Sequence, residues 1–170
     1  MPDLTLHPLP LTPERFAPFG QVIALDGQAE GLPHWPINDG HAMRYELQRD
    51  LQLQAEGGVP MLAIFRAPAR QFPLAVTVLE RHALGSQSFI PLGHKRFLLV
   101  VAAAGPAPAP EALHAFVTDG QQGVVLAPGT WHHALLAVDG GDFVVLERAA
   151  AQVDCEVVTI TAPVHVHLEP

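Results

Sequence analysis

The sequence predicts an all-β fold, a barrel or a sandwich with one or two short helices. Seventeen prolines and fourteen glycines divide the chain into short apolar segments, which is typical of strands joined by turns. No long stretch carries the apolar periodicity of an amphipathic helix. With 170 residues, of which 49% are hydrophobic, we expect one domain with one core over residues 1–170.

Two short helices are expected. Thr12 suits the N-cap of the first, Pro13 suits its first turn, and residues 18–20 end it. A second helix is predicted over residues 110–118, ended by Asp119 and Gly120. The apolar segments between turns predict ten strands, over residues 21–25, 43–47, 60–66, 74–82, 86–91, 97–103, 123–127, 132–138, 143–148 and 156–161.

Two connections are distinctive. Residues 105–110, with the sequence GPAPAP, predict an extended internal loop. Residues 28–40 form the longest expected loop and contain His34, Trp35 and Asn38. Such a loop is either functional or a structural flap packed by Trp35 and Ile37.

Composition restricts the partners and the compartment. A net charge of −8, with Lys95 as the one lysine, argues against a nucleic-acid partner. The longest apolar run, residues 97–104, is too short for a membrane span, and the first residues do not resemble a secretory signal. We therefore expect a cytoplasmic protein, with Cys155 as an inert, partly buried thiol.

A carboxylate and an imidazole end one predicted strand. Alternation over residues 74–82 predicts one face composed of Leu74, Val76, Val78, Glu80 and His82. An apolar face that becomes polar at one end is typical of a strand that runs from the packed interior of a barrel to its open end. The alternative is a strand that simply reaches solvent.

A turn ahead of another strand supplies further imidazoles. Pro128 and Gly129 precede His132 and His133, and alternation allows only one of the two histidines to face the barrel interior. We expect His132 inside and His133 in a structural role or at a subunit contact. Glu80, His82 and His132 are thus the candidate catalytic residues.

At these segments the chain resembles the cupin superfamily, whose second motif has the form Pro-x-Gly-x-x-His, and within it the bacterial ureidoglycolate lyases. The most specific matches are LERHALGSQSFIPL over residues 79–92 and GTWHH over residues 129–133. Weaker matches follow in the family's order: residues 37–40, 44–45, 65–67, 119–123, 142–143, 148 and 154–156. The chain departs from the family where Leu126 and Ala127 replace a Tyr-His pair, where Ala134 replaces a proline, and where Ala149 and Ala150 replace two glycines.

The resemblance implies a cupin-like β-barrel that cleaves (S)-ureidoglycolate to glyoxylate and urea. It implies His132 or Glu80 as the base, with His82 as a ligand or orienting group. The substrate-binding candidates are Arg44, Arg66 or Arg148 for the carboxylate, Asn38 for the urea amide, and Gln87 as an orienting group. It also points to a homodimer.

A divalent metal ion is a candidate cofactor, and no organic cofactor is expected. The ligands would be one carboxylate and two imidazoles, from Glu80, His82 and His132. A metal-free site remains the alternative, because cupins usually present His-x-His where this chain has Glu80-x-His82. Two further hypotheses stay open: a non-catalytic cupin that binds a small carboxylate, and a lyase or hydrolase of a related ureido or hydroxy acid. His165 and His167 are expected in an edge strand or a frayed tail.

Overall fold

The computed structural model describes residues 4–169, which form short strands joined by turns and loops. One α-helix is present in this part of the chain, α1 (Pro13–Phe16). The short 3-10 helices are η1 (Ala29–Gly31), η2 (Asn38–Gly40), η3 (Ala55–Gly57) and η4 (Pro110–Ala112). The strands are β1 (Leu4–Leu6), β2 (Leu9–Pro10), β3 (Gly20–Ile23), β4 (His34–Ile37), β5 (Ala42–Tyr45), β6 (Val59–Ala67), β7 (Leu74–Arg81), β8 (Gln87–Pro91), β9 (Phe97–Ala102), β10 (His114–Val117), β11 (Gly123–Leu126), β12 (Trp131–His132), β13 (Leu136–Ala137), β14 (Gly141–Ala149) and β15 (Glu156–Val166).

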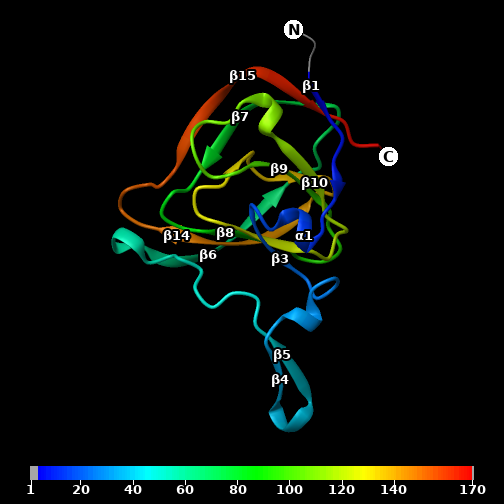
Figure 1. The fold of residues 1–170 in the computed structure, drawn as a ribbon, viewed down its shortest axis with the longest axis vertical. Coiled ribbons are helices and arrows are strands. Elements are labelled where there is room, and N and C mark those ends of the chain that lie inside the picture. The colour runs from blue at the N-terminus through cyan, green and yellow to red at the C-terminus, as the bar shows by residue number, and fades with distance from the viewer. Residues whose placement is uncertain (1–3, 170) are drawn as a thin grey trace.

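The strands form two curled sheets and a separate hairpin (Figure 1). Sheet A has the order β1-β15-β7-β12-β9-β10-β2, and β13 pairs with β9 beside this path. Sheet B has the order β3-β11-β8-β14-β6. Strands β4 and β5 pair with each other and extend away from the sheets as an arm. The predicted all-β class with short helices is confirmed.

Two apolar clusters lie on opposite faces of β9. Phe97, Leu99 and Val101 belong to the cluster between the two sheets, together with Phe89, Phe143 and other residues of sheet B. The alternate residues Leu98, Val100 and Ala102 belong to a second cluster with residues of β7, β10 and β15. Every residue of β9 is buried, which explains its uninterrupted apolar sequence.

The first helix agrees with the prediction. Thr12 is its N-cap, and its hydroxyl accepts a hydrogen bond of 3.3 Å from the Arg15 amide. Pro13 occupies the first turn, where the missing amide proton costs no hydrogen bond. Phe16 is fully buried against the edge of Phe116 and so attaches the helix to the core.

The second predicted helix is wrong. Residues 110–118 form only the turn η4 and then strand β10, which pairs antiparallel with β9 and parallel with β2. Pairing with the central strand satisfies the backbone of β10 and buries Ala115 and Phe116 on its two faces, so tertiary contacts override the local preference.

Three other expectations need correction. The predicted strand over residues 132–138 is two short strands, β12 and β13, and the expected loop over residues 28–40 contains β4. The segment with His165 is no frayed tail or edge, because β15 lies between β1 and β7. His165 pairs with Ala75 on one side and Thr5 on the other, which holds the end of the strand in place.

The face predicted for β7 changes in the middle of the strand. Leu79 lies in the same apolar cluster as Leu74 and Val76, whereas Val78 is 41% exposed. The neighbouring strand β15 shifts its register to β7 over the same stretch, which indicates a bulge. Glu80 is therefore not on the face of Leu74 and Val76.

No helix within residues 4–169 has the length and apolar character that crossing a membrane requires.

Candidate active site

Two adjacent strands of sheet A bring the first pair of site residues together. Glu80 on β7 and His132 on β12 are direct partners in the antiparallel register. Their side chains therefore share one face, and the His132 Nε2 atom lies 3.4 Å from the Glu80 Oε1 atom. The imidazole is 2% exposed, whereas the carboxylate keeps 28% of its side-chain surface. His132 lies inside the site, as the sequence predicts.

His82 follows β7 and is held by the segment that leads into β15. Its Nδ1 atom is 2.7 Å from the Asp154 carbonyl oxygen. The Asp154 carboxylate in turn accepts hydrogen bonds from the Ala83 and Leu84 amides, at 3.0 and 2.7 Å. Asp154 thus fixes both the ring of His82 and the turn that follows it.

The two imidazoles present free nitrogens to the same space. The rings of His82 and His132 lie 5.2 Å apart, centre to centre. The His132 Nδ1 atom is 3.0 Å from the Thr130 carbonyl oxygen, just as the His82 Nδ1 atom contacts the Asp154 carbonyl oxygen. Because a carbonyl only accepts hydrogen bonds, we assign the proton of each neutral ring to Nδ1. Both Nε2 atoms are buried with unshared lone pairs and without a hydrogen-bond partner.

Sheet B supplies an amide on the other side. Gln87 begins β8 and donates a hydrogen bond of 2.7 Å to Glu147, its register partner on β14. Its Oε1 atom is buried without a hydrogen-bond partner. Glu147 belongs to none of the motifs that predict the site. Its place beside Gln87 depends on the pairing of two strands far apart in the chain.

Charge in the cluster follows from these contacts. When His132 is protonated at Nε2, its hydrogen bond to Glu80 and its charge lower the pKa of Glu80 and outweigh the opposing effect of burial. Partial desolvation of the thiol beside Glu80 and the charge of that carboxylate raise the pKa of Cys155, whose Sγ lies 3.7 Å from Glu80 Oε2. Cys155 is exposed rather than partly buried, and its raised pKa keeps it a thiol rather than a reactive thiolate.

The donor atoms fit a divalent metal ion. One ligand atom each from Glu80, His82 and His132 lie within 4.8 Å of one another. The second nitrogen of each imidazole already contacts a backbone carbonyl, the arrangement that orients histidine ligands in metal sites. The buried, unpartnered Nε2 atoms are those a cation would use.

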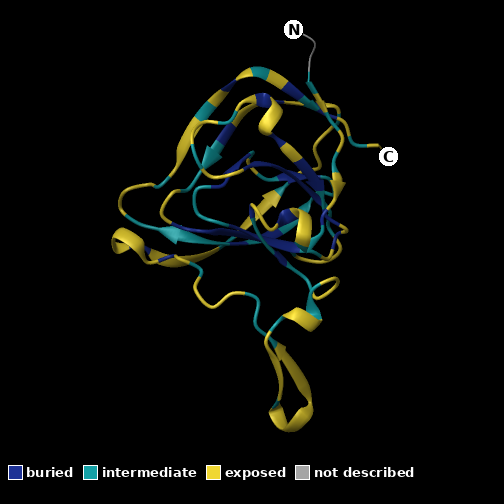
Figure 2. Cartoon of the chain, in the orientation of Figure 1, coloured by how far each residue is buried: buried dark blue, intermediate teal, exposed yellow. Residues whose placement is uncertain are grey.

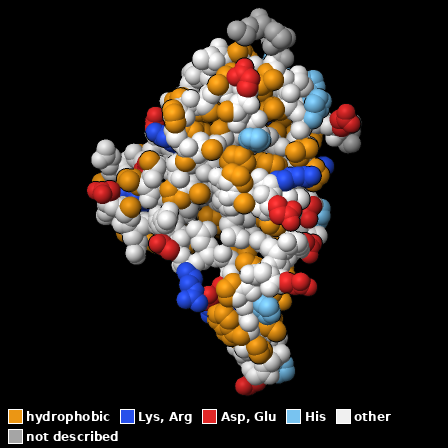
Figure 3. All heavy atoms as spheres, viewed as in Figure 1, with side chains coloured by type: hydrophobic (Ala, Val, Ile, Leu, Met, Phe, Trp, Pro, Cys, Tyr) orange, Lys and Arg blue, Asp and Glu red, His pale blue; other side chains and the backbone are white. Residues whose placement is uncertain are grey.

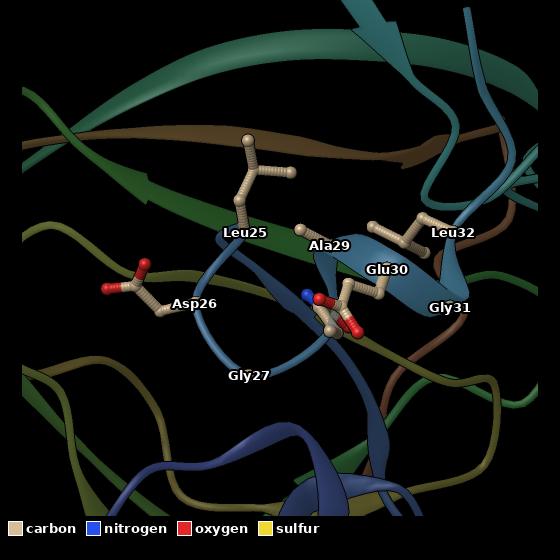
Figure 4. Close-up of a pocket in the computed structure, with 8 residues that line it drawn as sticks. Leu25, Asp26, Gly27, Ala29, Glu30, Gly31 and Leu32 are labelled. Carbon is tan, nitrogen blue, oxygen red and sulfur yellow. The ribbon is translucent and has the colours of Figure 1, made fainter.

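A cavity of about 440 Å³ adjoins this cluster. Glu80 and Gln87 line its polar side, and Phe65, Phe89 and Leu135 line its apolar side. Its volume suits a small ligand. A larger cavity of about 750 Å³ lies in the loop between β3 and β4, where Leu25 and Asp26 point in different directions (Figure 4). That loop does not gather convergent polar groups.

Two of the predicted arginines are engaged elsewhere. Arg66 lines the cavity adjoining Glu80, but its guanidinium makes a two-pronged ion pair with Asp142, at 2.8 and 2.9 Å. Arg148 donates to the backbone carbonyls of Ala55 and Glu56, at 2.8 and 3.2 Å. It secures the turn before β6 and does not line the cavity.

Arg44 and Asn38 lie on the arm, which projects from the sheets (Figure 1). Asn38 is part of the arm's tip, with a positive φ of 53°. Arg44 lies over the Trp35 ring at 5.5 Å. The structure does not bring either residue to the cavity of its own chain.

The departure from the family pattern lies in the core. Leu126 is the register partner of Gln87 and is 2% exposed within the cluster between the sheets. Ala127 donates its amide to the Phe19 carbonyl at 2.9 Å. The side chain at position 126 therefore fills apolar space beneath the polar cluster.

Comparison with known proteins identifies the family. The family model for ureidoglycolate lyase matches residues 3–167. The chain belongs to the ureidoglycolate lyase family. The ureidoglycolate lyase of Burkholderia cepacia is 44% identical over 94% of this chain and 89% of its own length. The ureidoglycolate lyase of Pseudomonas syringae pv. syringae is 44% identical over 86% of this chain and 85% of its own length.

Further comparisons agree with that family at the sequence level. A ureidoglycolate lyase from Pseudomonas fluorescens SBW25 is 43% identical over 89% of both chains.

Among solved structures, a dTDP sugar isomerase from Desulfovibrio desulfuricans aligns with 85% of this chain and 88% of its own, at 18% identity and a TM-score of 0.44. The rmlC epimerase of Mycobacterium tuberculosis aligns with 75% of this chain and 66% of its own, at 11% identity and a TM-score of 0.44.

Proposed function

We propose that this chain is a lyase that cleaves ureidoglycolate into glyoxylate and urea. The observation that carries the proposal is a group of three buried, unpartnered acceptor atoms: His82 Nε2, His132 Nε2 and Gln87 Oε1. Gln87 lines the small cavity together with Glu80, the register partner of His132. Buried polar atoms without partners are costly in a folded protein, so a ligand that satisfies them explains their retention. A small, polar ureido acid has the donors to do so.

The reaction requires one proton to move between two substrate atoms. A base takes the proton of the carbinol hydroxyl, and the carbonyl of glyoxylate forms as the carbon–nitrogen bond breaks. The departing urea nitrogen then receives a proton, and no water is consumed. One side chain that accepts the first proton and returns it to nitrogen balances the reaction.

We assign that proton transfer to His132, with Glu80 as its stabilising partner. The free Nε2 atom of His132 is the acceptor, and burial keeps it from competing water. The lowered pKa of Glu80 keeps its carboxylate anionic, so that it stabilises the imidazolium formed 3.4 Å away. Gln87 is suited to accept from a ureido N–H group through its unpartnered oxygen.

A divalent metal, if bound, would be held by Glu80, His82 and His132. It would polarise a substrate oxygen as a Lewis acid. The metal and the proton would use the same lone pair of His132, so the two roles of this residue are alternatives. Metal analysis of the purified protein, with turnover measured before and after chelation, distinguishes them. Full turnover by metal-free protein would assign the chemistry to the side chains alone.

The direct test is turnover of racemic ureidoglycolate, followed as glyoxylate and urea. We expect His132→Asn and Glu80→Gln to lower kcat by about 10²–10⁴-fold, the usual contribution of general acid–base catalysis. Leu9→Lys, an exposed change on β2, is the matched control and should retain wild-type turnover. Equal turnover in wild type and His132→Asn, or none above background in wild type with and without divalent ions, would refute the proposal.

The replacement at positions 126 and 127 supports a second candidate, a cupin that binds a small carboxylate without turnover. Calorimetric titration with glyoxylate tests it. Binding by a protein that lacks turnover, abolished by His132→Asn, would favour this candidate.

A further inference from the structure

Glu147 places a carboxylate on the inward face of sheet B. Side chains alternate along β14, and the face that carries Glu147 also carries Phe143 and Val145, which are both 0% exposed. Several carboxylates lie on the molecular surface in Figure 3, whereas Glu147 is partly buried. Acidic side chains seldom leave water without a partner, so the contact that holds Glu147 inside points to its role.

The partner of Glu147 is the Gln87 side chain. The two residues are register partners on β14 and β8, and Gln87 Nε2 donates a hydrogen bond of 2.7 Å to Glu147 Oε2. On the other side of Gln87, its register partner on β11 is Leu126, which is apolar and 2% exposed. The three strands lie in the buried and half-buried part of the molecule (Figure 2). Of the two register neighbours of Gln87, Glu147 is thus the one whose side chain can bind the amide.

This carboxylate determines which end of the Gln87 amide is free. An amide has donors at its nitrogen and an acceptor at its oxygen, whereas a carboxylate only accepts. Glu147 therefore binds the Gln87 nitrogen and excludes the flipped amide, in which two oxygens would face each other. Gln87 Oε1 is left buried without a hydrogen-bond partner, and Gln87 lines the cavity of about 440 Å³ together with Glu80. The pair thus presents an acceptor, and no donor, at this wall of the cavity.

We propose that Glu147 determines specificity through Gln87: it fixes the amide so that its oxygen selects ligands with an N–H donor over ligands of similar shape that have none. Glu147 does not line the cavity, so it is a positioning residue rather than a catalytic one. That the selected donor belongs to a ureido acid rests on the proposed function. A ligand without the donor leaves Gln87 Oε1 unpaired and buried, which is costly.

Two ligands of similar shape and equal charge test this selection without turnover. Ureidoacetate has the ureido nitrogens but lacks the hydroxyl that the elimination requires. Levulinate keeps the carbonyl and the carboxylate and has carbon in place of both nitrogens. We expect calorimetric titration to show that wild type binds ureidoacetate about 10–100-fold more tightly than levulinate. Equal affinities, or no binding of ureidoacetate, would overturn the inference.

Glu147→Gln tests the role of the carboxylate. An amide at position 147 can accept or donate, so Gln87 can turn its nitrogen toward the cavity and donate to the levulinate carbonyl. The two affinities should then come to within about threefold of each other, because each ligand finds a partner in one orientation. Glu30→Gln, the same change at an exposed residue of η1, is the matched control and should keep the wild-type ratio. A wild-type ratio in Glu147→Gln would overturn the role of Glu147.

A reversed pair separates the orientation of the amide from support of the fold. When Gln87→Glu is combined with Glu147→Gln, the amide at position 147 donates to the carboxylate at position 87, and the cavity again faces an acceptor. Both ligands carry one carboxylate, so the added charge weakens both and cancels in the ratio of their affinities. We expect the double variant to regain the preference for ureidoacetate that Glu147→Gln loses. A double variant with a native circular dichroism spectrum and the ratio of Glu147→Gln would contradict this mechanism.

These titrations do not depend on catalysis. A wild type that prefers ureidoacetate but forms no glyoxylate from ureidoglycolate would refute the proposed lyase and leave the role of Glu147 in place. A wild type that turns over ureidoglycolate but binds ureidoacetate and levulinate equally would refute the role of Glu147 alone.

Discussion

Asp154 determines the position of a site residue without facing the cavity. Its carbonyl oxygen accepts a hydrogen bond from His82 Nδ1. Its carboxylate accepts hydrogen bonds from two successive backbone amides in the turn between His82 and β8. The ring nitrogen that points into the site is free because the other nitrogen is occupied. Outer contacts of this kind orient an imidazole and select its tautomer.

At the residue scale, we expect Asp154→Ala to lower kcat by up to about 10-fold, the lower end of the usual effect of losing an orienting contact, because the turn after His82 loses two hydrogen bonds while the carbonyl that contacts the ring remains. The change removes both carboxylate contacts to the turn while keeping the carbonyl. Asp154→Asn retains one acceptor oxygen and should recover part of the loss. The measurement is the pH profile of kcat/KM for the three proteins. An unchanged profile with normal kcat in Asp154→Ala would show that His82 needs no such support.

At the element scale, turns fix the strands that carry the site. The turn between β13 and β14 is held by Asp139, which accepts hydrogen bonds from the backbone amide and the guanidinium of Arg96, at 2.9 to 3.1 Å. These contacts attach the start of β14 to the start of β9. Gly140 and Gly141 are local turn residues, but no neighbouring residue indicates that Arg96, 43 positions from Asp139, holds this turn.

The Asp139 contact should make stability depend on pH. Hydrogen bonds from Arg96 lower the pKa of Asp139 below its ordinary value of 3.8. The folded state therefore favours the charged carboxylate, and this stabilisation is complete above the unfolded-state pKa and lost as pH falls through the lower folded-state pKa. We expect Asp139→Asn to reduce the free energy of unfolding by about 0.5–1 kcal/mol at pH 7, because the pair is partly screened by solvent.

Urea unfolding at pH 7 and at pH 3 checks this prediction. The difference between wild type and Asp139→Asn should shrink at the lower pH. Asp26→Asn, in the exposed loop after β3, is the matched control and should leave stability unchanged. A difference that grows on acidification would contradict the assignment.

At the scale of the whole molecule, β9 joins two cores. Its alternate residues belong to different apolar clusters, so neither cluster can lose its packing without exposing β9. Trp131 lies in one of them, 1% exposed, with its Nε1 donating to the Gly105 carbonyl at 3.1 Å. Such sharing of a central strand predicts one cooperative unfolding transition.

Trp131 provides the probe for that cooperativity. In a Trp35→Phe background, Trp131 is the one remaining tryptophan. Its fluorescence and the far-UV circular dichroism should give coincident urea transitions at a fixed protein concentration. Phe97→Ala and Leu98→Ala, in opposite clusters, should each lower both midpoints, at a cost of about 2–5 kcal/mol. Separate transitions for the two probes would show that the clusters unfold independently.

The sequence by itself determined the all-β class, the helix at Thr12, and the local motifs that carry Glu80, His82, Gln87 and His132. Turn residues, alternation and a motif over a few positions are local properties, and they can be read from neighbouring letters. Only the tertiary structure decided which distant strands pair. Pairing put Glu147 beside Gln87, turned residues 114–117 into a strand, and shifted the face of β7. It also carried Arg44 away from the cavity of its own chain. Long-range strand register depends on packing across the whole barrel, and this physical coupling has no signature in any one segment.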